Sequence, residues 1–129
     1  MINPIREQIR SMLKVERRAG GFRAAFHVRA DLEILPDHFP DGMILPGVCM
    51  IQAVLLAAAE AQGFDLKLRM LKNAKMMAPI LPGDEIMIEA DVSAGLDGDI
   101  VVKARLNGAD KCRADISLIA RPDAGGTPA

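Results

Sequence analysis

A histidine, a glycine at a predicted helix start and one amide lie close together in the sequence, and these groups suit acid/base chemistry on a carbonyl compound. His38 precedes Pro46-Gly47, and the apolar stretch that follows holds a single polar side chain, Gln52. An imidazole exchanges protons near neutral pH, and backbone N–H groups at a helix start stabilise negative charge on an oxygen. We therefore predict that His38 acts as a base, that Gly47 supplies an oxyanion donor and that Gln52 holds a hydroxyl.

A long helix must position two of these groups. The pattern predicts a helix over residues 47–62, closed by Gly63. Because this segment is apolar on nearly every side for about three turns, it must be surrounded by protein. A shorter amphipathic helix is expected over residues 3–13, with Asn3 as its cap and Pro4 in its first turn.

The remaining segments alternate apolar and polar residues, which is typical of strands with one buried face. Gly20-Gly21, Asp97-Gly98 and Asn107-Gly108 are turn signals between such segments. The sequence thus predicts an α+β fold, in which a curved antiparallel sheet of about six strands wraps around one long central helix. We expect one domain over residues 1–120 and a disordered Pro/Gly-rich tail over residues 121–129. The expected strands cover residues 15–18, 22–30, 66–77, 85–92, 101–106 and 111–118.

Composition narrows the range of partners and compartments. The chain has 129 residues and a formal net charge of −1, without Trp or Tyr, so nucleic acid is not an expected partner. No apolar run is long enough to span a membrane, and no secretory signal is visible. The two cysteines, Cys49 and Cys112, are expected to be free buried thiols in a reducing cytoplasm.

Two motifs carry a resemblance to a known family. The segments His38-Phe39-Pro40 and Pro46-Gly47-Val48 resemble the H-F-P-x5-P-G-V signature of the hotdog-fold 3-hydroxyacyl-[acyl-carrier-protein] dehydratases. The segment 78–86, A-P-I-L-P-G-D-E-I, is similar to that family's R-P-V-V-P-G-D-Q-L turn into a strand. The resemblance covers roughly residues 22–120.

The resemblance implies a hotdog homodimer or higher oligomer with active sites at the subunit boundary. It also implies dehydration of 3-hydroxyacyl thioesters to trans-2-enoyl thioesters in fatty acid or related acyl-chain biosynthesis. The substrate would arrive on the phosphopantetheine of an acyl carrier protein or of coenzyme A, with no other cofactor and no metal. By this resemblance the catalytic residues are His38 and Gln52, and the substrate-binding residues are Gly47, Val48, Phe39 and Pro46.

One position departs from the family pattern. The family's catalytic glutamate lies fourteen residues after the motif histidine, and that position here is Gln52. An amide can hold a hydroxyl group but cannot deliver a proton as an acid does. Glu60 lies eight residues further along, about 12 Å away on a helix, so it cannot occupy the same place.

Several hypotheses follow from this departure. His38 could both remove the C2 proton and return it to the leaving hydroxyl, or Asp37, Asp41 or a partner chain could supply the proton. The site could also be catalytically inactive and only hold acyl chains, as a partner subunit of a complete relative. A hotdog acyl-thioesterase is a further alternative, in which Gln52 would orient a water molecule.

Two other groups of side chains have a functional and a plain interpretation. Methionines can line a flexible acyl tunnel or fill the core, and a basic strand can form a rim for an acidic carrier or a solvated face. The methionines are Met43, Met50, Met70, Met76 and Met77, and the basic residues are Lys67, Arg69, Lys72 and Lys75.

Overall fold

The computed structural model describes residues 4–29 and 47–123. Helices and strands account for most of these residues. Their bounds are α1 Pro4–Ser11, β1 Leu13–Arg18, β2 Gly21–His27, α3 Gly47–Gln62, β3 Leu66–Met76, β4 Glu85–Ala94, the 3-10 turn η1 Leu96–Gly98, β5 Ile100–Asn107 and β6 Cys112–Pro122.

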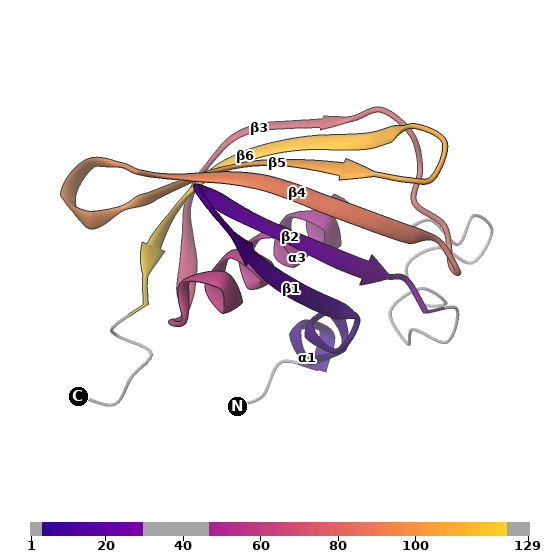
Figure 1. Ribbon diagram of the computed structural model, residues 1–129, viewed down its shortest axis with the longest axis horizontal. Helices are drawn as coiled ribbons and strands as arrows, with labels where there is room; N and C mark the ends of the chain where they lie inside the picture. The colour runs from indigo at the N-terminus through magenta and orange to yellow at the C-terminus, as the bar shows by residue number, and fades with distance from the viewer. Residues whose placement is uncertain (1–3, 30–46, 124–129) are drawn as a thin grey trace.

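The described strands form one six-stranded antiparallel sheet in the order β1-β2-β4-β5-β6-β3. Figure 1 shows the sheet arching over α3, with α1 near the start of β1. This arrangement confirms the predicted hotdog fold, including the short N-terminal helix. The two edge strands of the sheet are β1 and β3, which lie far apart in sequence.

The apolar phase of each central strand forms the core. Phe22 and Phe26 of β2 are buried, while His27 on the same strand is exposed and lies 3.5 Å from Glu85. The inner faces of β4, β5 and β6 bury their apolar residues against α3 in the same alternation. These residues are Ile86, Ile88, Val102, Leu106, Ala114, Ile116 and Leu118.

The predicted enclosure of the helix is confirmed along most of α3, including Cys49 and Met50 of its first turn, while Val48 is left uncovered by this chain. Ala53, Ala57 and Ala58 are fully buried, and their small side chains allow the sheet to pack closely on the helix. Val48, in contrast, is 71% exposed. A single sheet covers only the side of a helix that faces it, so the other side of the first turn needs a different cover.

The helix stop and the hairpin turns predicted at glycine-containing positions can be compared with the structure. Gly63 has a φ of 86° and ends α3, as predicted, and its N–H donates to the Ala59 carbonyl at 2.9 Å. Asp97 and Gly98 both have positive φ and turn β4 into β5. The Asn107-Gly108 signal marks a real hairpin, but Asn107 pairs with Cys112 and a longer loop joins the two strands.

The last strand runs beyond the predicted end of the domain. β6 passes Ala120 and continues to Pro122, which pairs with Leu66 at the start of β3. The backbone N–H of Asp123 donates to the Asp65 carbonyl at 2.8 Å. The start of the predicted tail is therefore part of the sheet, and residues 124–129 lie outside the described residues.

A buried carboxylate ties the β4–β5 hairpin to two other strands. Asp99 is only 2% exposed, and it accepts hydrogen bonds from Arg69 of β3 and from Arg121 of β6, the latter at 3.1 Å. Burial by itself would raise the pKa of Asp99, but the hydrogen bonds from Arg121 and Arg69 and their positive charges outweigh burial. The pKa of Asp99 therefore lies below its usual value.

This low pKa predicts a specific acid sensitivity. A carboxyl group whose pKa is lowered by folding stabilises the fold above its unfolded pKa of about 3.9, and the stabilisation is lost as the pH falls further. We expect Asp99→Asn to lower the urea midpoint at about pH 7, with a smaller difference from wild type at about pH 3. The matched control is Asp91→Asn, which removes an exposed carboxylate from β4. An equal loss for Asp99→Asn at both pH values would contradict this account.

Candidate active site

The structure describes three of the six predicted site residues. Gly47, Val48 and Gln52 all lie on α3, whereas His38, Phe39 and Pro46 lie outside the described residues, as do Asp37 and Asp41. The geometry of the base and of the two flanking carboxyl groups therefore stays a prediction. The structure does define α3, the helix that carries the predicted oxyanion donor Gly47 and the amide of Gln52.

Gly47 is the first residue of α3. The N–H groups of a first helical turn lack partners within the helix, and the helix dipole favours negative charge there. Among the described residues, the nearest neighbour of a Cβ built on Gly47 is the terminal methyl of Met76, at 3.4 Å. Gly47 is partly exposed, and among the described residues a side chain at this position would meet only the flexible end of Met76.

Gln52 lies on a face of α3 that the sheet does not cover. Residues four apart share one side of a helix, which places Gln52 about 6 Å further along from Val48. Val48 is exposed, and Ile51 and Gln52 are partly buried, whereas Cys49 and Met50 between them are buried. The amide is thus not enclosed in the core of its own chain, and it stands where a ligand or a second chain can reach it.

Apolar side chains extend this open face beyond the helix. Met76 at the end of β3 and Met77 after it are 43% and 42% exposed, and Leu81 is 42% exposed. Met50, one of the predicted tunnel methionines, is instead buried in the core, and Met43 lies outside the described residues. The exposed methionines give the face a flexible apolar rim, a surface that suits an alkyl chain.

The second sequence motif forms a turn that is fastened to β2. The carboxylate of Asp84 accepts a hydrogen bond from the Leu81 N–H at 2.9 Å, and the Asp84 carbonyl accepts one from Val28 at 2.9 Å. Gly83 has a φ of 90° and donates its N–H to the Val28 carbonyl at 2.6 Å. Val28 directly follows the end of β2, so these hydrogen bonds attach the turn just beyond that strand.

Arg113 holds the same turn from β6, and the sequence pattern does not single it out. Its guanidinium donates to the Pro79 carbonyl at 2.7 Å, to Asp84 at 3.0 Å and to Asp110 at 3.1 Å. The hydrogen bond from Arg113 is the main reason that the pKa of Asp110 lies below its usual value. In sequence, Arg113 belongs to the polar phase of its strand, and that pattern alone indicates a solvated side chain rather than one that is only 13% exposed.

Neither cysteine looks like a nucleophile in this fold. Cys49 is buried in α3 next to Val48, and burial raises the pKa of its thiol. A thiol with a raised pKa carries less of the reactive thiolate at neutral pH. Cys112 is half-buried at the start of β6. Both thiols are free, as predicted, but the predicted burial is confirmed for Cys49 only.

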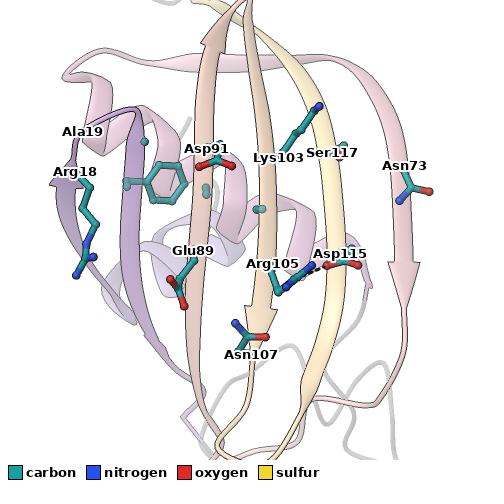
Figure 2. Close-up of a pocket in the computed structure, with 14 residues that line it drawn as sticks. Arg18, Ala19, Asn73, Glu89, Asp91, Lys103, Arg105, Asn107, Asp115 and Ser117 are labelled. Carbon is teal, nitrogen blue, oxygen red and sulfur yellow. Dashed lines mark hydrogen bonds and ion pairs between the residues drawn. The ribbon is translucent and has the colours of Figure 1, made fainter.

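A hollow lies on the side of the sheet that faces away from α3. Figure 2 shows its lining, which comes from the outer face of the strands and includes Glu89, Asp91, Lys103, Arg105 and Asp115. Its volume is about 640 Å³. Because the outer face points away from α3, this hollow is separate from the site predicted at Gly47 and Gln52.

The described residues hold neither a cluster of metal ligands nor a membrane-spanning helix. In residues 4–29 and 47–123, no three His, Cys, Asp or Glu side chains converge as a set of metal ligands. No helix among the same residues is long and apolar enough to cross a membrane.

Comparison with known proteins decides the family. The ApeI-like family, described as ApeI dehydratase, matches residues 14–111, which is most of the chain. The chain belongs to the ApeI-like dehydratase family. The match spans the strands of the sheet from β1 to β5 and the whole of α3.

Relatives and solved structures agree with this assignment. The chain is 28% identical over 109 residues to the 3-hydroxyacyl-[acyl-carrier-protein] dehydratase FabZ of Thermus thermophilus. This match covers 76% of each of the two chains. The FabZ of Clostridium acetobutylicum is 29% identical over 115 residues, with 80% of this chain and 77% of that relative covered. The solved dehydratase heterocomplex ApeI:P from Xenorhabdus doucetiae contains a chain of the same fold. The TM-score to that chain is 0.70 at 19% identity, and the match covers 84% of the ApeI-like chain and 94% of that chain.

The open backbone at Gly47 gives a direct test of the site. We expect Gly47→Ala to keep the fold, since its nearest described contact is the end of a flexible side chain, and to lower kcat/KM for dehydration by about 10²-fold. The added methyl group would stand where the thioester oxygen must approach the helix start. The comparison variant is Gly21→Ala, whose Cβ would lie 1.9 Å from the Ala90 carbonyl oxygen and should destabilise the sheet. Full activity of a folded Gly47→Ala protein would exclude Gly47 from the substrate surface.

Proposed function

We propose that the protein dehydrates 3-hydroxyacyl thioesters to trans-2-enoyl thioesters. Membership of the ApeI-like dehydratase family supports this reaction, as do the FabZ relatives, which are 3-hydroxyacyl-[acyl-carrier-protein] dehydratases. The observation that carries the proposal is the open face of α3. A glycine at the helix start and an amide less than two turns further along are both accessible there.

The reaction needs a base, a stabiliser of negative charge and a way for the hydroxyl to leave. In our proposal His38 removes the proton from C2, and the electron pair of that C–H bond forms the C2–C3 double bond. Charge that builds on the thioester oxygen is stabilised by the N–H groups at Gly47. The C3–O bond then breaks, and the hydroxyl leaves as water with the proton that His38 returns.

Gln52 has a positioning task in this scheme. Its amide holds the 3-hydroxyl by a hydrogen bond and keeps the C3–O bond near the imidazole, but it gives up no proton. Loss of a general acid typically costs about 10² to 10⁴ in rate, so we expect a slow enzyme. Val48, Phe39 and Pro46 are proposed to contact the substrate around this centre.

The substrate is proposed to be bound to a carrier. The 3-hydroxyacyl group would arrive as a thioester on the phosphopantetheine of an acyl carrier protein or of coenzyme A, and the protein itself would need no cofactor and no metal. We propose that the reaction takes place in the cytoplasm as part of fatty acid or related acyl-chain biosynthesis. The open face of α3 implies an oligomer, because a second chain placed there would shield the site from water.

A non-catalytic partner subunit is the second candidate function. Two points favour it: by the family resemblance Gln52 occupies the position of the catalytic glutamate, and the solved ApeI:P neighbour is a dehydratase heterocomplex. In that role the chain would hold an acyl group or complete the site of another subunit. The same protein preparation can distinguish the two candidates.

The deciding experiment is a dehydration assay by mass spectrometry with 3-hydroxyacyl-carrier substrates of several chain lengths. We expect the wild type to release water from at least one of them, and His38→Ala to abolish this release because the base is lost. Gln52→Ala should retain part of the rate, since the amide only positions the hydroxyl. No water loss by the wild type together with activity in Gln52→Glu would mean a scaffold that lacks its acid, and would favour the partner-subunit function.

A further inference from the structure

The stretch between β3 and β4 has no ladder of backbone hydrogen bonds to hold it, so its path depends on bonds to fixed neighbours. Residues 77–84 lie in neither a helix nor a strand. Ile80 is fully buried, while Met77 and Leu81 are both 42% exposed. Residues 76–81, the rim segment, begin at Met76, whose terminal methyl lies 3.4 Å from a Cβ built on Gly47. The position of the rim segment therefore shapes the surroundings of the helix start.

Arg113 of β6 holds the rim segment with both its backbone and its side chain. Its carbonyl accepts hydrogen bonds from the N–H groups of Met77 at 2.8 Å and of Ala78 at 3.1 Å. Its guanidinium donates to the Pro79 carbonyl at 2.7 Å and to the Asp84 carboxylate at 3.0 Å. Because a guanidinium is planar and its donors point in fixed directions, these bonds select one position for the segment.

The bond to Asp84 extends this support to the end of the rim segment. The Asp84 carboxylate also accepts the Leu81 N–H at 2.9 Å, and the Leu81 carbonyl accepts the Asp84 N–H at 3.1 Å. The side chains of Arg113 and Asp84 are only 13% and 26% exposed, so their charge-assisted hydrogen bond is stronger than that of a surface ion pair. One guanidinium thus ties down the segment from Met77 to Leu81.

The β5–β6 hairpin leaves room for this guanidinium. A Cβ on Gly108 would lie 2.7 Å from Nε and 2.8 Å from Nη2 of Arg113, which is too close for either group to stay in place. Asp110 of the same hairpin accepts a hydrogen bond from the guanidinium at 3.1 Å. The missing side chain at Gly108 is therefore a condition for the bonds from Arg113 to the rim segment.

We propose that Arg113 is a positioning residue that sets the acyl-chain preference of the site. The inference rests on the proposed function, since it takes the ligand to be an acyl thioester whose carbonyl lies at Gly47. An alkyl chain that leaves this carbonyl along the rim segment would meet Met76 and then Met77 and Leu81. Methionine side chains adapt to many shapes, so a defined preference needs a backbone that is held in one place. Arg113 supplies that hold without touching the ligand.

Binding of saturated acyl thioesters tests the proposal without any chemistry, because these ligands carry no 3-hydroxyl. We would titrate the full chain with acyl groups of about 4, 8 and 12 carbons, each on coenzyme A and on an acyl carrier protein, in a calorimeter. Each methylene removed from water can tighten binding by up to about fourfold, so affinity against chain length reports the apolar surface that the rim segment offers.

The expected result is a change in preference rather than a uniform loss of affinity. The wild type should favour one chain length over the others by about 10-fold or more, and Arg113→Gln should reduce this ratio to about threefold or less. The affinity for the shortest acyl group should change by less than about twofold, since a short chain contacts little of the rim segment. A merely destabilised fold would weaken all three lengths alike.

Matched variants separate the hold on the rim segment from the loss of an arginine. Gly108→Ala displaces the guanidinium while every residue of the rim segment and Arg113 itself stay unchanged, so it should reduce the ratio in the same way, and it carries the test where Arg113→Gln does not fold. Asp110→Asn removes only the bond to the hairpin and should keep the wild-type ratio. Arg105→Gln removes an exposed arginine–carboxylate pair on the outer face of the sheet and should keep it as well.

Hydrogen exchange reads the position of the rim segment directly and needs no ligand. The Leu81 amide is held by Asp84, so its exchange should become at least about 10-fold faster in Arg113→Gln and in Gly108→Ala. The same amide should exchange at the wild-type rate in Asp110→Asn and Arg105→Gln. Circular dichroism would establish that each variant is folded.

Three results would overturn the proposal. Unchanged exchange at Leu81 in a folded Arg113→Gln or Gly108→Ala protein would mean that Arg113 does not hold the segment. Faster exchange with an unchanged chain-length ratio would mean that the segment does not meet the acyl chain, and a wild type without any preference would leave Arg113 nothing to set. Failure of the wild type to bind any acyl thioester, on either carrier, would instead contradict the proposed function itself and the inference with it.

Discussion

The structure depends on the burial of α3 against one face of the sheet. Burying a large apolar side chain contributes roughly 1.5 to 3 kcal/mol, and the inner faces of β2, β4, β5 and β6 bury several such residues. The alanines of α3 make this contact close. A helix without any polar side would be unstable in water, so the sheet must curve around it.

The same burial explains where the site can be. Residues 53–59 of α3 are all buried. Nearer the helix start the enclosure is incomplete, since Val48 is exposed and Gly47 and Gln52 are partly exposed. The groups suited to chemistry therefore lie at the border of the core, where apolar surface, free backbone donors and an amide meet.

Much of this could be predicted from the sequence because it depends on periodicity. The alternation around Phe22 and Phe26, the long apolar helix and the Gly63 stop each follow from local rules, and the structure confirms them. The position of Gln52 on α3 was also predictable. Its partial exposure was not, since exposure depends on how far the sheet curves around the helix, and no local pattern encodes that.

The sequence analysis did not predict the ion pairs between residues that are far apart in the chain. Asp99 with Arg69 and Arg121, and Arg113 with Asp84, join residues that are far apart in sequence and that each look like ordinary polar positions on a strand. Their role depends on strand order, which places β3 next to β6.

The central claim is that one imidazole performs both proton transfers while Gln52 contributes none, and the pH dependence of kcat/KM tests it most directly. For the wild type acting on a 3-hydroxyacyl thioester, the account predicts that kcat/KM rises through one ionisation at about pH 6.5 and then stays level. Gln52→Glu should add a falling limb at higher pH, since it introduces an acid that must be protonated. A bell-shaped profile in the wild type would contradict the account, because it would require a separate proton donor.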